Sequence, residues 1–237
     1  MTASTFTAGR PDNWVLAALP ERQYRQLLPG LEPVIFERDE VLFEAGQPIP
    51  HVYFPCGGLV SLLAPVEGDK VAEVAVVGKE GVVGLPAFLG GGTSTLRALV
   101  QGPGPALRGR TADFRDRARR NPALNDRLLR YADAFLVQVA QSAVCNCLHP
   151  VPKRYCRWLL MAHDRVGSDR LPFTQKHLAL MLTVRLASIS EATGSLERAG
   201  LIHYRRGEFH ILDRPGLEAA ACGCYRLIHD YFARLPQ

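Results

Sequence analysis

Short runs of apolar and β-branched residues, separated by turn signals, dominate the first half of the chain. The runs are residues 34–36, 51–54, 59–63 and 71–77. Gly- and Pro-containing segments at 44–48 and 55–58, and a Gly-Asp turn at 67–69, lie between them. Runs of this length bounded by Gly, Pro and Asp are typical of antiparallel strands. We therefore predict a compact antiparallel sandwich or roll here.

The segments on both sides of this region have apolar residues at helical spacing. Residues 14–28 are predicted to form one or two short helices broken near Pro20. After residue 110 the pattern changes to helix, first over 111–120. The chain as a whole is thus predicted to be α+β.

A longer helix is predicted to start at Asn121, which suits an N-cap, and Pro122, which suits the first helical position. Its apolar stripe consists of Leu124, Leu128, Tyr131, Phe135, Leu136, Val139 and Cys145. The stripe either packs back on the roll of its own chain or pairs with the same helix of a second subunit. We favour pairing, because the stripe approximates a heptad seam. Residues 151–152 are then expected to be a hinge, followed by a helix over 153–163.

Residues 174–200 predict two short amphipathic helices joined by a tight turn. Thr174 suits the N-cap of the first helix, and residues 183–184 make the break. The expected buried side of the second helix is Ile189, Ala192, Thr193, Leu196 and Ala199. Gly200 is a C-terminal signal.

Residues 201–212 predict a two-stranded hairpin with its turn at Arg206-Gly207. A hairpin placed after a helix-turn-helix forms a wing. Arg205 and Arg206 near its tip can contact phosphates, while the N-terminal half of the second helix reaches base edges. Helix pair, wing and local positive charge together favour double-stranded DNA as the partner.

The charge distribution supports this interpretation. The net charge is +5, and residues 1–147 hold 15 Lys and Arg against 15 Asp and Glu, whereas residues 148–237 hold 13 against 8. The excess positive charge is therefore C-terminal, where it can attract a phosphate backbone.

The composition and motifs exclude several classes. With 47% hydrophobic and 22% charged residues, the chain is typical of a globular protein. Neither a signal sequence nor an apolar run of roughly 18 residues is present, so we expect a cytoplasmic protein without membrane contact. G-x-S-x-G, H-E-x-x-H and phosphate-binding-loop motifs are absent, and we do not expect an enzyme.

The six cysteines include two C-x-C pairs, Cys145/Cys147 and Cys222/Cys224. Either pair could hold a metal or sense oxidants, but free Cys in an apolar helical pattern commonly packs as a small hydrophobe, and we favour that interpretation. Haem could be ligated by His51, His149 or His163. A lone His near apolar residues is more often structural, and we favour that role for these three. We accordingly assign no metal and no cofactor.

At the helix-turn-helix and wing the chain resembles transcriptional regulators of the Crp/Fnr type, and the resemblance extends over nearly all of the sequence. It implies a cyclic-nucleotide-binding-like roll over residues 1–120, a dimerisation helix and hinge over 121–150, and a winged helix-turn-helix DNA-binding domain over 151–237. It also implies a homodimer, a small-molecule effector and RNA polymerase as a further candidate partner.

The start of the recognition helix departs from the family pattern. Many members carry Arg-Glu-Thr there, followed by another Arg, where this chain has Leu186-Ala187-Ser188 and Glu191. Arg185 could supply a guanine contact and Leu186 or Ala187 could meet a thymine methyl group. We expect Arg185 and Ser188 to read bases. The full predicted DNA-binding set is Thr174, Gln175, Lys176, Arg185, Leu186, Ala187, Ser188, Glu191, Arg205 and Arg206.

The expected effector pocket departs as well. Cyclic-nucleotide binders of this family use Gly-Glu-apolar-Gly and an Arg-Ser/Thr pair. The matching residues here are Gly81, Val82 and Gly84, and then Arg97 and Ala98. Valine cannot accept the hydrogen bond that the Glu would take, and alanine lacks the hydroxyl, so we expect an effector other than cyclic AMP, or none.

These features predict a sequence-specific DNA-binding transcriptional regulator. The alternative is a divergent family member that acts as a protein- or ligand-binding module, or as a redox sensor, with little base-specific reading of DNA.

Overall fold

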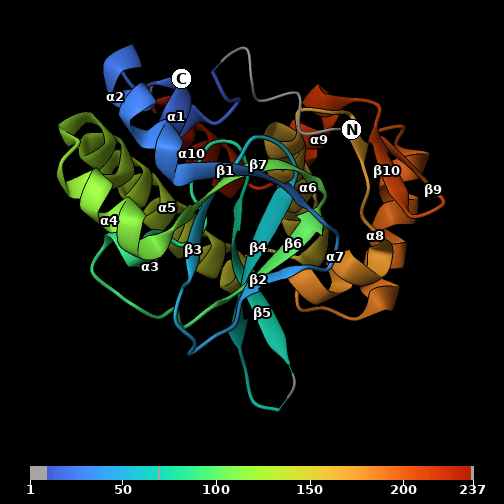
Figure 1. Ribbon diagram of the computed structural model, residues 1–237. Helices are drawn as coiled ribbons and strands as arrows, with labels where there is room; N and C mark the ends of the chain where they lie inside the picture. Colours follow the sequence, from blue (N-terminus) through green and yellow to red (C-terminus); the bar gives the residue numbers. More distant parts are fainter. Residues whose placement is uncertain (1–9, 69, 236–237) are drawn as a thin grey trace.

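The computed structural model describes residues 10–68 and 70–235, which form a β-roll, a long helix and a winged helix (Figure 1). The strands of the roll are β1 (Leu31–Phe36), β2 (Val41–Phe43), β3 (His51–Pro55), β4 (Leu59–Pro65), β5 (Val71–Val77), β6 (Arg97–Gly102) and β7 (Gly104–Arg110). They pair in two antiparallel sheets, ordered β1-β7-β3 and β2-β6-β4-β5. Each predicted apolar run lies within one of these strands, which confirms the roll.

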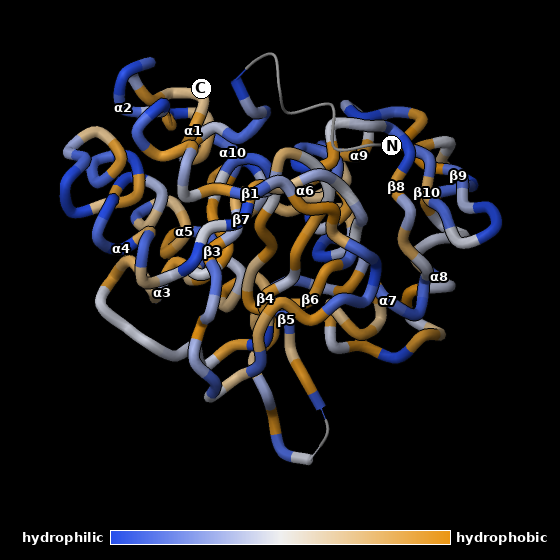
Figure 2. Tube along the Cα trace, viewed as in Figure 1, coloured by the Kyte–Doolittle hydropathy of each residue, from blue (hydrophilic) through white to orange (hydrophobic). Residues whose placement is uncertain are grey.

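The inner faces of the two sheets form the core of the roll. Phe54, Leu59 and Val100 have no exposed surface. Figure 2 shows the apolar residues following the central strands, with polar residues around the periphery. Burial of each large aliphatic or aromatic side chain contributes roughly 1.5–3 kcal/mol, and this burial holds the sheets face to face.

Short helices close the ends of the roll. They are α1 (Trp14–Ala17), α2 (Glu21–Leu27), the 3-10 turn η2 (Leu28–Gly30), α3 (Leu85–Phe88) and α4 (Thr111–Arg119). The break at Pro20 between α1 and α2 is as predicted, because Pro20 precedes the first residue of α2. Asn13 caps α1 by accepting a hydrogen bond from the Leu16 amide.

The long helix α5 (Pro122–Leu148) is capped by Asn121, whose side-chain oxygen accepts a hydrogen bond from the Leu124 amide at 3.0 Å. The predicted stripe along α5 packs mainly inside its own chain: Leu124, Leu128 and Tyr131 are buried against the roll. These buried members of the stripe are not available to a second subunit, whereas Leu136, in the same stripe, is 65% exposed. Intersubunit pairing through the exposed part of the stripe stays a prediction. Leu136 shares an exposed face of α5 with Leu129 and Ala140.

Helix α6 (Val151–Val166) begins directly after His149-Pro150. The predicted hinge at 151–152 is corrected, because both residues lie in the first turn of α6. Pro152 is tolerated there, since first-turn amides have no partner within the helix. The change of direction occurs at His149 and Pro150, which both have extended backbone conformations.

The remaining elements form the winged helix and a C-terminal extension. They are β8 (Arg170–Leu171), α7 (Gln175–Met181), α8 (Leu186–Arg198), β9 (Ile202–Arg205), β10 (Glu208–Ile211), α9 (Arg214–Ala220) and α10 (Gly223–Ala233). The wing gains a third strand that the sequence pattern did not indicate, because β8 pairs with β10. After α9 the chain returns to the long helix, where α10 packs against α5 and α6.

A buried ion pair connects the roll to α6. The Arg165 guanidinium donates to the Glu80 carboxylate at 2.8 Å, and the two side chains are 6% and 5% exposed. Arg165 also donates to the Gln138 amide oxygen on α5, and its guanidinium lies over the Phe232 ring of α10, 5.3 Å from the centroid. One arginine thus contacts the roll, the long helix and the C-terminal helix.

A half-buried carboxyl, Glu73 on β5, also meets α6, and its hydrogen-bond partners are neutral. It accepts a hydrogen bond from the Trp158 indole at 2.7 Å and another from the Ser61 hydroxyl. Desolvation by burial raises the pKa of Glu73 to about 7. Its contact with α6 therefore depends on pH near neutrality.

Candidate DNA-binding surface

The first helix of the helix-turn-helix is α7, and side-chain hydrogen bonds fix its start. The Thr174 hydroxyl accepts from the His177 amide at 3.2 Å, as expected for an N-cap. The Ser190 hydroxyl of α8 donates to the Gln175 side-chain oxygen at 2.7 Å. Of the predicted DNA-binding residues, Thr174 therefore caps α7 and Gln175 links α7 to α8, whereas Lys176 is exposed.

A tight turn joins α7 to α8 where the sequence placed the break. Thr183 adopts a left-handed conformation with φ of 53°, and the Val184 amide donates to the Ala179 carbonyl. Arg185 is the N-cap residue of α8, and its side chain makes no capping hydrogen bond. The amides of the first turn of α8 therefore lie beside an exposed cationic side chain, an arrangement that favours anionic partners.

Helix α8 buries one side and exposes the other. The buried residues are Ile189, Ala192, Thr193 and Leu196. The Thr193 hydroxyl is hydrogen-bonded to the Tyr155 hydroxyl of α6 at 2.9 Å. Ala199, expected to be buried, is exposed because the helix ends at Arg198 and Ala199 is its C-cap.

The exposed side of α8 carries most of the predicted reading residues. Leu186 is 49% exposed, and Ala187 and Glu191 are exposed as well. Ser188 is half-buried near the start of the same face. Arg198 lies farther along this face and is exposed. The helical period places Arg198 on the outward side with Arg185 and Glu191, but the predicted DNA-binding set did not include it.

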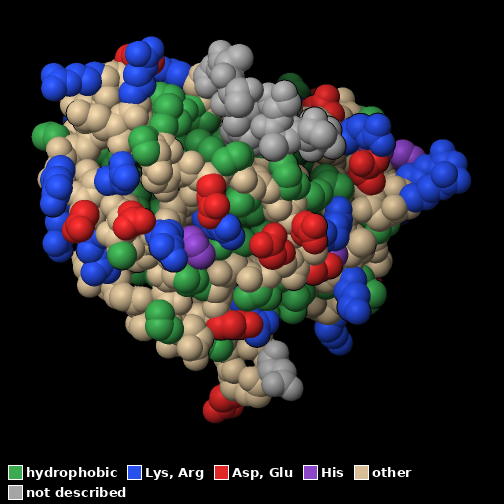
Figure 3. Space-filling model, viewed as in Figure 1, with side chains coloured by type: hydrophobic (Ala, Val, Ile, Leu, Met, Phe, Trp, Pro, Cys, Tyr) green, Lys and Arg blue, Asp and Glu red, His purple; other side chains and the backbone are tan. Residues whose placement is uncertain are grey.

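The wing is a tight hairpin anchored to α8. Its turn residues Arg206 and Gly207 have φ values of 53° and 81°, which suits a two-residue connection between twisted strands. The Tyr204 amide donates to the Glu197 carboxylate of α8 at 2.8 Å. Arg205 and Arg206 are exposed, and Figure 3 shows a cluster of basic side chains projecting from this end of the hairpin.

A groove separates the start of α8 from the roll. Its volume is about 1050 Å³, and Arg185 and Ser188 line it together with roll residues such as Asp39 and Lys70. The Asp39 carboxylate lies 3.6 Å from the His177 imidazole on α7. In this conformation the start of the recognition helix thus faces the roll across a groove, while the wing tip projects away from it.

The expected effector residues lie at two places in the roll. A Cβ atom at Gly81 would lie 2.2 Å from the Tyr131 ring, so glycine is needed there for the close approach of α5. Val82 and Gly84 line an apolar cavity of about 120 Å³ between the roll and α5. Arg97 pairs with the Glu44 carboxylate at 2.7 Å, and Ala98 beside it is fully buried.

No helix in the described ranges is long and apolar enough to span a membrane. A β-roll, a long connecting helix and a winged helix-turn-helix, in this order along the chain, define a class of two-domain transcriptional regulators.

Comparisons with known proteins identify the family. A profile of the cyclic nucleotide-binding domain matches residues 33–121, and a profile of the Crp-like helix-turn-helix domain matches residues 153–220, together more than half of the chain. The chain belongs to the Crp/Fnr family of transcriptional regulators. The search of curated protein sequences gave no match.

Solved structures share the fold at low sequence identity. FixK2 from Bradyrhizobium japonicum superposes with a TM-score of 0.70 at 15% identity, covering 81% of this chain and 98% of that one. The c-di-GMP-responsive global regulator CLP from Xanthomonas campestris gives 0.63 at 15%, covering 81% and 99%. TTHA1359, a CRP/FNR-family transcriptional regulator from Thermus thermophilus, gives 0.58 at 19%, covering 80% and 98%. These similarities are evidence for the architecture.

Proposed function

We propose that the protein is a homodimeric transcriptional regulator that reads DNA with the N-terminal half of α8 and grips phosphates with its wing. The observation that carries this proposal is the placement of Arg185, Arg205 and Arg206. All three are exposed, and they lie on the two elements that a winged helix presents to DNA. Lys176, at the start of α7, adds a fourth exposed cation to the same domain.

The base preference follows from the chemistry of the exposed helix face. Arg185 can donate two hydrogen bonds to guanine, while Leu186 and Ala187 can contact the methyl group of thymine. Glu191 accepts hydrogen bonds and therefore favours a cytosine amino group. The preferred site thus differs from the one read by the Arg-Glu-Thr pattern.

The exposed face of α5 supports a homodimer. Residues 129, 133, 136, 140, 143 and 147 are all exposed and are spaced alternately by four and three positions. This is the spacing of a coiled-coil seam, and every member except Asp133 is apolar. Leu136 is 65% exposed, so a monomer leaves most of this apolar side chain in water. Contact with a second copy of α5 would bury it.

The cavity beside α5 supports an effector other than a cyclic nucleotide. Val82 is buried and cannot accept a hydrogen bond, and Arg97 already pairs with Glu44. The polar side chain in the lining, Ser94, accepts a hydrogen bond from the Leu96 amide. A cavity of about 120 Å³ with such walls suits a small apolar molecule, since apolar cavities of about 150 Å³ hold ligands the size of benzene.

The proposal is tested by fluorescence anisotropy with fragments of the organism's own genome over a series of salt concentrations. We expect some fragments to bind about 1,000-fold more tightly than bulk DNA. Equal affinity for all fragments at every salt concentration would refute sequence-specific reading. Sedimentation of wild type and Leu136→Asp tests the dimer: the variant should be monomeric at concentrations where wild type is dimeric, and Arg130→Asp, a charge change beside the seam, is the control.

A further inference from the structure

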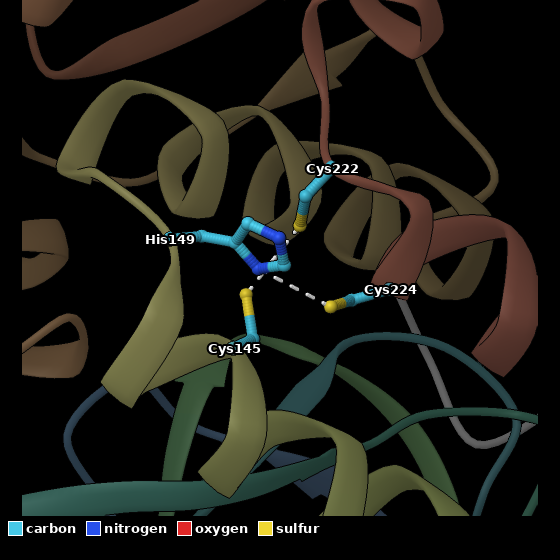
Figure 4. Close-up of side chains that lie close together, drawn as sticks. All are labelled: Cys145, His149, Cys222 and Cys224. Atoms are coloured by element: carbon cyan, nitrogen blue, oxygen red, sulfur yellow. Dashed lines mark hydrogen bonds between the residues drawn. The ribbon is translucent and has the colours of Figure 1, made fainter.

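Four side chains with metal-binding atoms converge where the end of α5 meets the start of α10. They are Cys145, His149, Cys222 and Cys224, and their ligand atoms all lie within 4.8 Å of one another. Figure 4 shows the three sulfur atoms and the imidazole ring pointing into the same space. Residues that are about 75 positions apart in the sequence thus form one compact cluster.

The distances fit a tetrahedral ion. The sulfur atoms of Cys145 and Cys222 are 3.4 Å apart, and the Cys224 sulfur is 3.5 Å from Nδ1 of His149. Zinc bound at about 2.3 Å from sulfur and about 2.0 Å from nitrogen places tetrahedral ligands roughly 3.5–3.8 Å apart. The other pairs of ligand atoms are at most 4.8 Å apart, so shifts of about 1 Å or less would bring these four atoms to the coordination distances of zinc.

The cysteines are buried, yet they are separate from the main core. Cys145, Cys222 and Cys224 are 0%, 5% and 3% exposed and form a small cluster of their own, while Cys156 belongs to the main core. The side-chain amide of Gln141 donates to the Cys224 sulfur at 3.1 Å. Hydrogen bonds to ligand sulfur are a regular feature of metal sites, because they orient the ligand and stabilise the thiolate.

The backbone explains why one cysteine of the first C-x-C pair takes part and the other does not. Cys145 and His149 are four positions apart at the end of α5, and the His149 amide donates to the Cys145 carbonyl at 3.0 Å, so both side chains lie on the same side. Cys147 lies between them on another side and is exposed. Cys222 is the N-cap residue of α10 and Cys224 lies in its first turn.

We propose that Cys145, Cys222, Cys224 and His149 bind one zinc-class divalent ion, which clamps the start of α10 to the end of α5. Three thiolates and one imidazole fill a tetrahedral shell, so the ion is structural, and the thiols release their protons to solvent on binding. The clamp lies beside His149-Pro150, where α5 gives way to α6. Given the proposed function, the ion would stabilise the position of the DNA-binding domain relative to the dimer helix.

The site is tested first by metal analysis of the full-length protein, purified without oxygen, loaded with zinc chloride and freed of excess ion. We expect about one zinc per chain in wild type and in Cys147→Ser, the matched control from the same C-x-C pair. Cys222→Ser and His149→Asn should lose most of it. Absence of zinc from wild type, or equal content in Cys147→Ser and Cys222→Ser, would overturn the proposal.

Two measurements on wild type avoid dependence on variant folding. Cobalt(II) in place of zinc should give thiolate-to-metal charge-transfer absorption and the strong visible bands of a tetrahedral ion. Zinc should also slow alkylation of Cys145, Cys222 and Cys224 without changing that of Cys156, which is equally buried but belongs to the main core rather than to this cluster. An octahedral cobalt spectrum, equal zinc protection of Cys156, or a Cys145–Cys222 disulfide in protein kept reduced would each contradict the site.

DNA affinity separates the failure of this site from the failure of the proposed function. Chelation of zinc should lower specific DNA affinity by roughly 5–150-fold, the usual range of coupling between sites. Zinc binding without any DNA binding would refute the proposed function and leave the site intact. Specific DNA binding that is unchanged by chelation would refute the clamp's effect on DNA binding.

Discussion

The winged helix and the β-roll present opposite chemistry to their ligands. The winged helix exposes Arg185, Arg205 and Arg206 on its DNA-facing elements. In the roll, by contrast, Arg97 is neutralised by Glu44, and Val82 and Ala98 are buried where the family pattern has polar residues. The winged helix thus carries exposed positive charge, whereas the cavity of the roll is apolar, and the proposed function assigns DNA binding to the first region and a small apolar effector to the second.

The largest effect is expected from removing the charge of the winged helix. We expect a triple variant to lower specific DNA affinity about 1,000-fold or more, because a dimer loses three contacts in each protomer. The variant combines Arg185→Ala, Arg205→Ala and Arg206→Ala. The slope of log affinity against log salt should become less negative by about 4, from the four wing arginines. The matched control replaces three other exposed arginines by Ala. They lie on or next to the helices that close the roll: Arg22, Arg119 and Arg120. An equal loss in the control would mean that only net charge matters.

The connection between the two regions is tested next. Glu80→Ala leaves the Arg165 guanidinium buried without its partner, which should lower the free energy of unfolding by about 3–5 kcal/mol. Arg97→Ala removes an exposed pair and should cost less than about 1 kcal/mol. Denaturant unfolding measures both. Similar values for the two variants would show that the buried pair does not hold the roll to α6.

A smaller effect, confined to a pH range, is expected at Glu73. Burial raises the pKa of Glu73 from its ordinary value of 4.5 to about 7 in the folded protein, so between these values the folded state holds a proton that the unfolded state has lost. Wild-type stability should therefore fall as pH rises from about 4.5 to about 7, by at most about 3 kcal/mol from this residue. Glu73→Gln keeps an acceptor for Trp158 and cannot ionise. Parallel stability curves for variant and wild type across this range would contradict the raised pKa.

The smallest effect is expected in the sensor cavity. Millimolar cyclic AMP should leave the melting temperature and the DNA affinity unchanged, because a ligand that does not bind the folded state does not stabilise it. Cyclic GMP serves as a second nucleotide probe. Stabilisation by either nucleotide would show that the roll still holds a phosphate despite the Arg97–Glu44 pair.

Local signals in the sequence predicted much of the fold. Asn121 and Thr174 were recognised as N-caps because a cap depends on one side chain and an amide three positions away. The hairpin turn at Arg206-Gly207 was predicted because a two-residue turn also depends on a few neighbouring residues. The third strand of the wing, β8, is two residues long and was missed because so short a segment shows no alternation.

Features that depend on packing between distant segments could not be predicted. Helical period alone did not distinguish the face of α5 that packs on its own roll from the exposed face around Leu136. The cysteines were expected to pack as hydrophobes, and no metal was assigned, because the sequence does not show that His149 and Cys145 meet Cys222 and Cys224 in space. The predicted domain boundaries and the individual roles of the DNA-binding residues stay predictions.

The central claim, that the winged helix reads a DNA sequence, is tested most directly by selecting bound molecules from a random pool of double-stranded DNA. We expect enrichment of a near-palindromic site whose half-sites lie about one helical turn apart. Each half-site should contain a guanine whose preference disappears when the selection is repeated with Arg185→Ala. A pool that remains random after repeated selection, while the protein still binds bulk DNA, would contradict sequence-specific regulation.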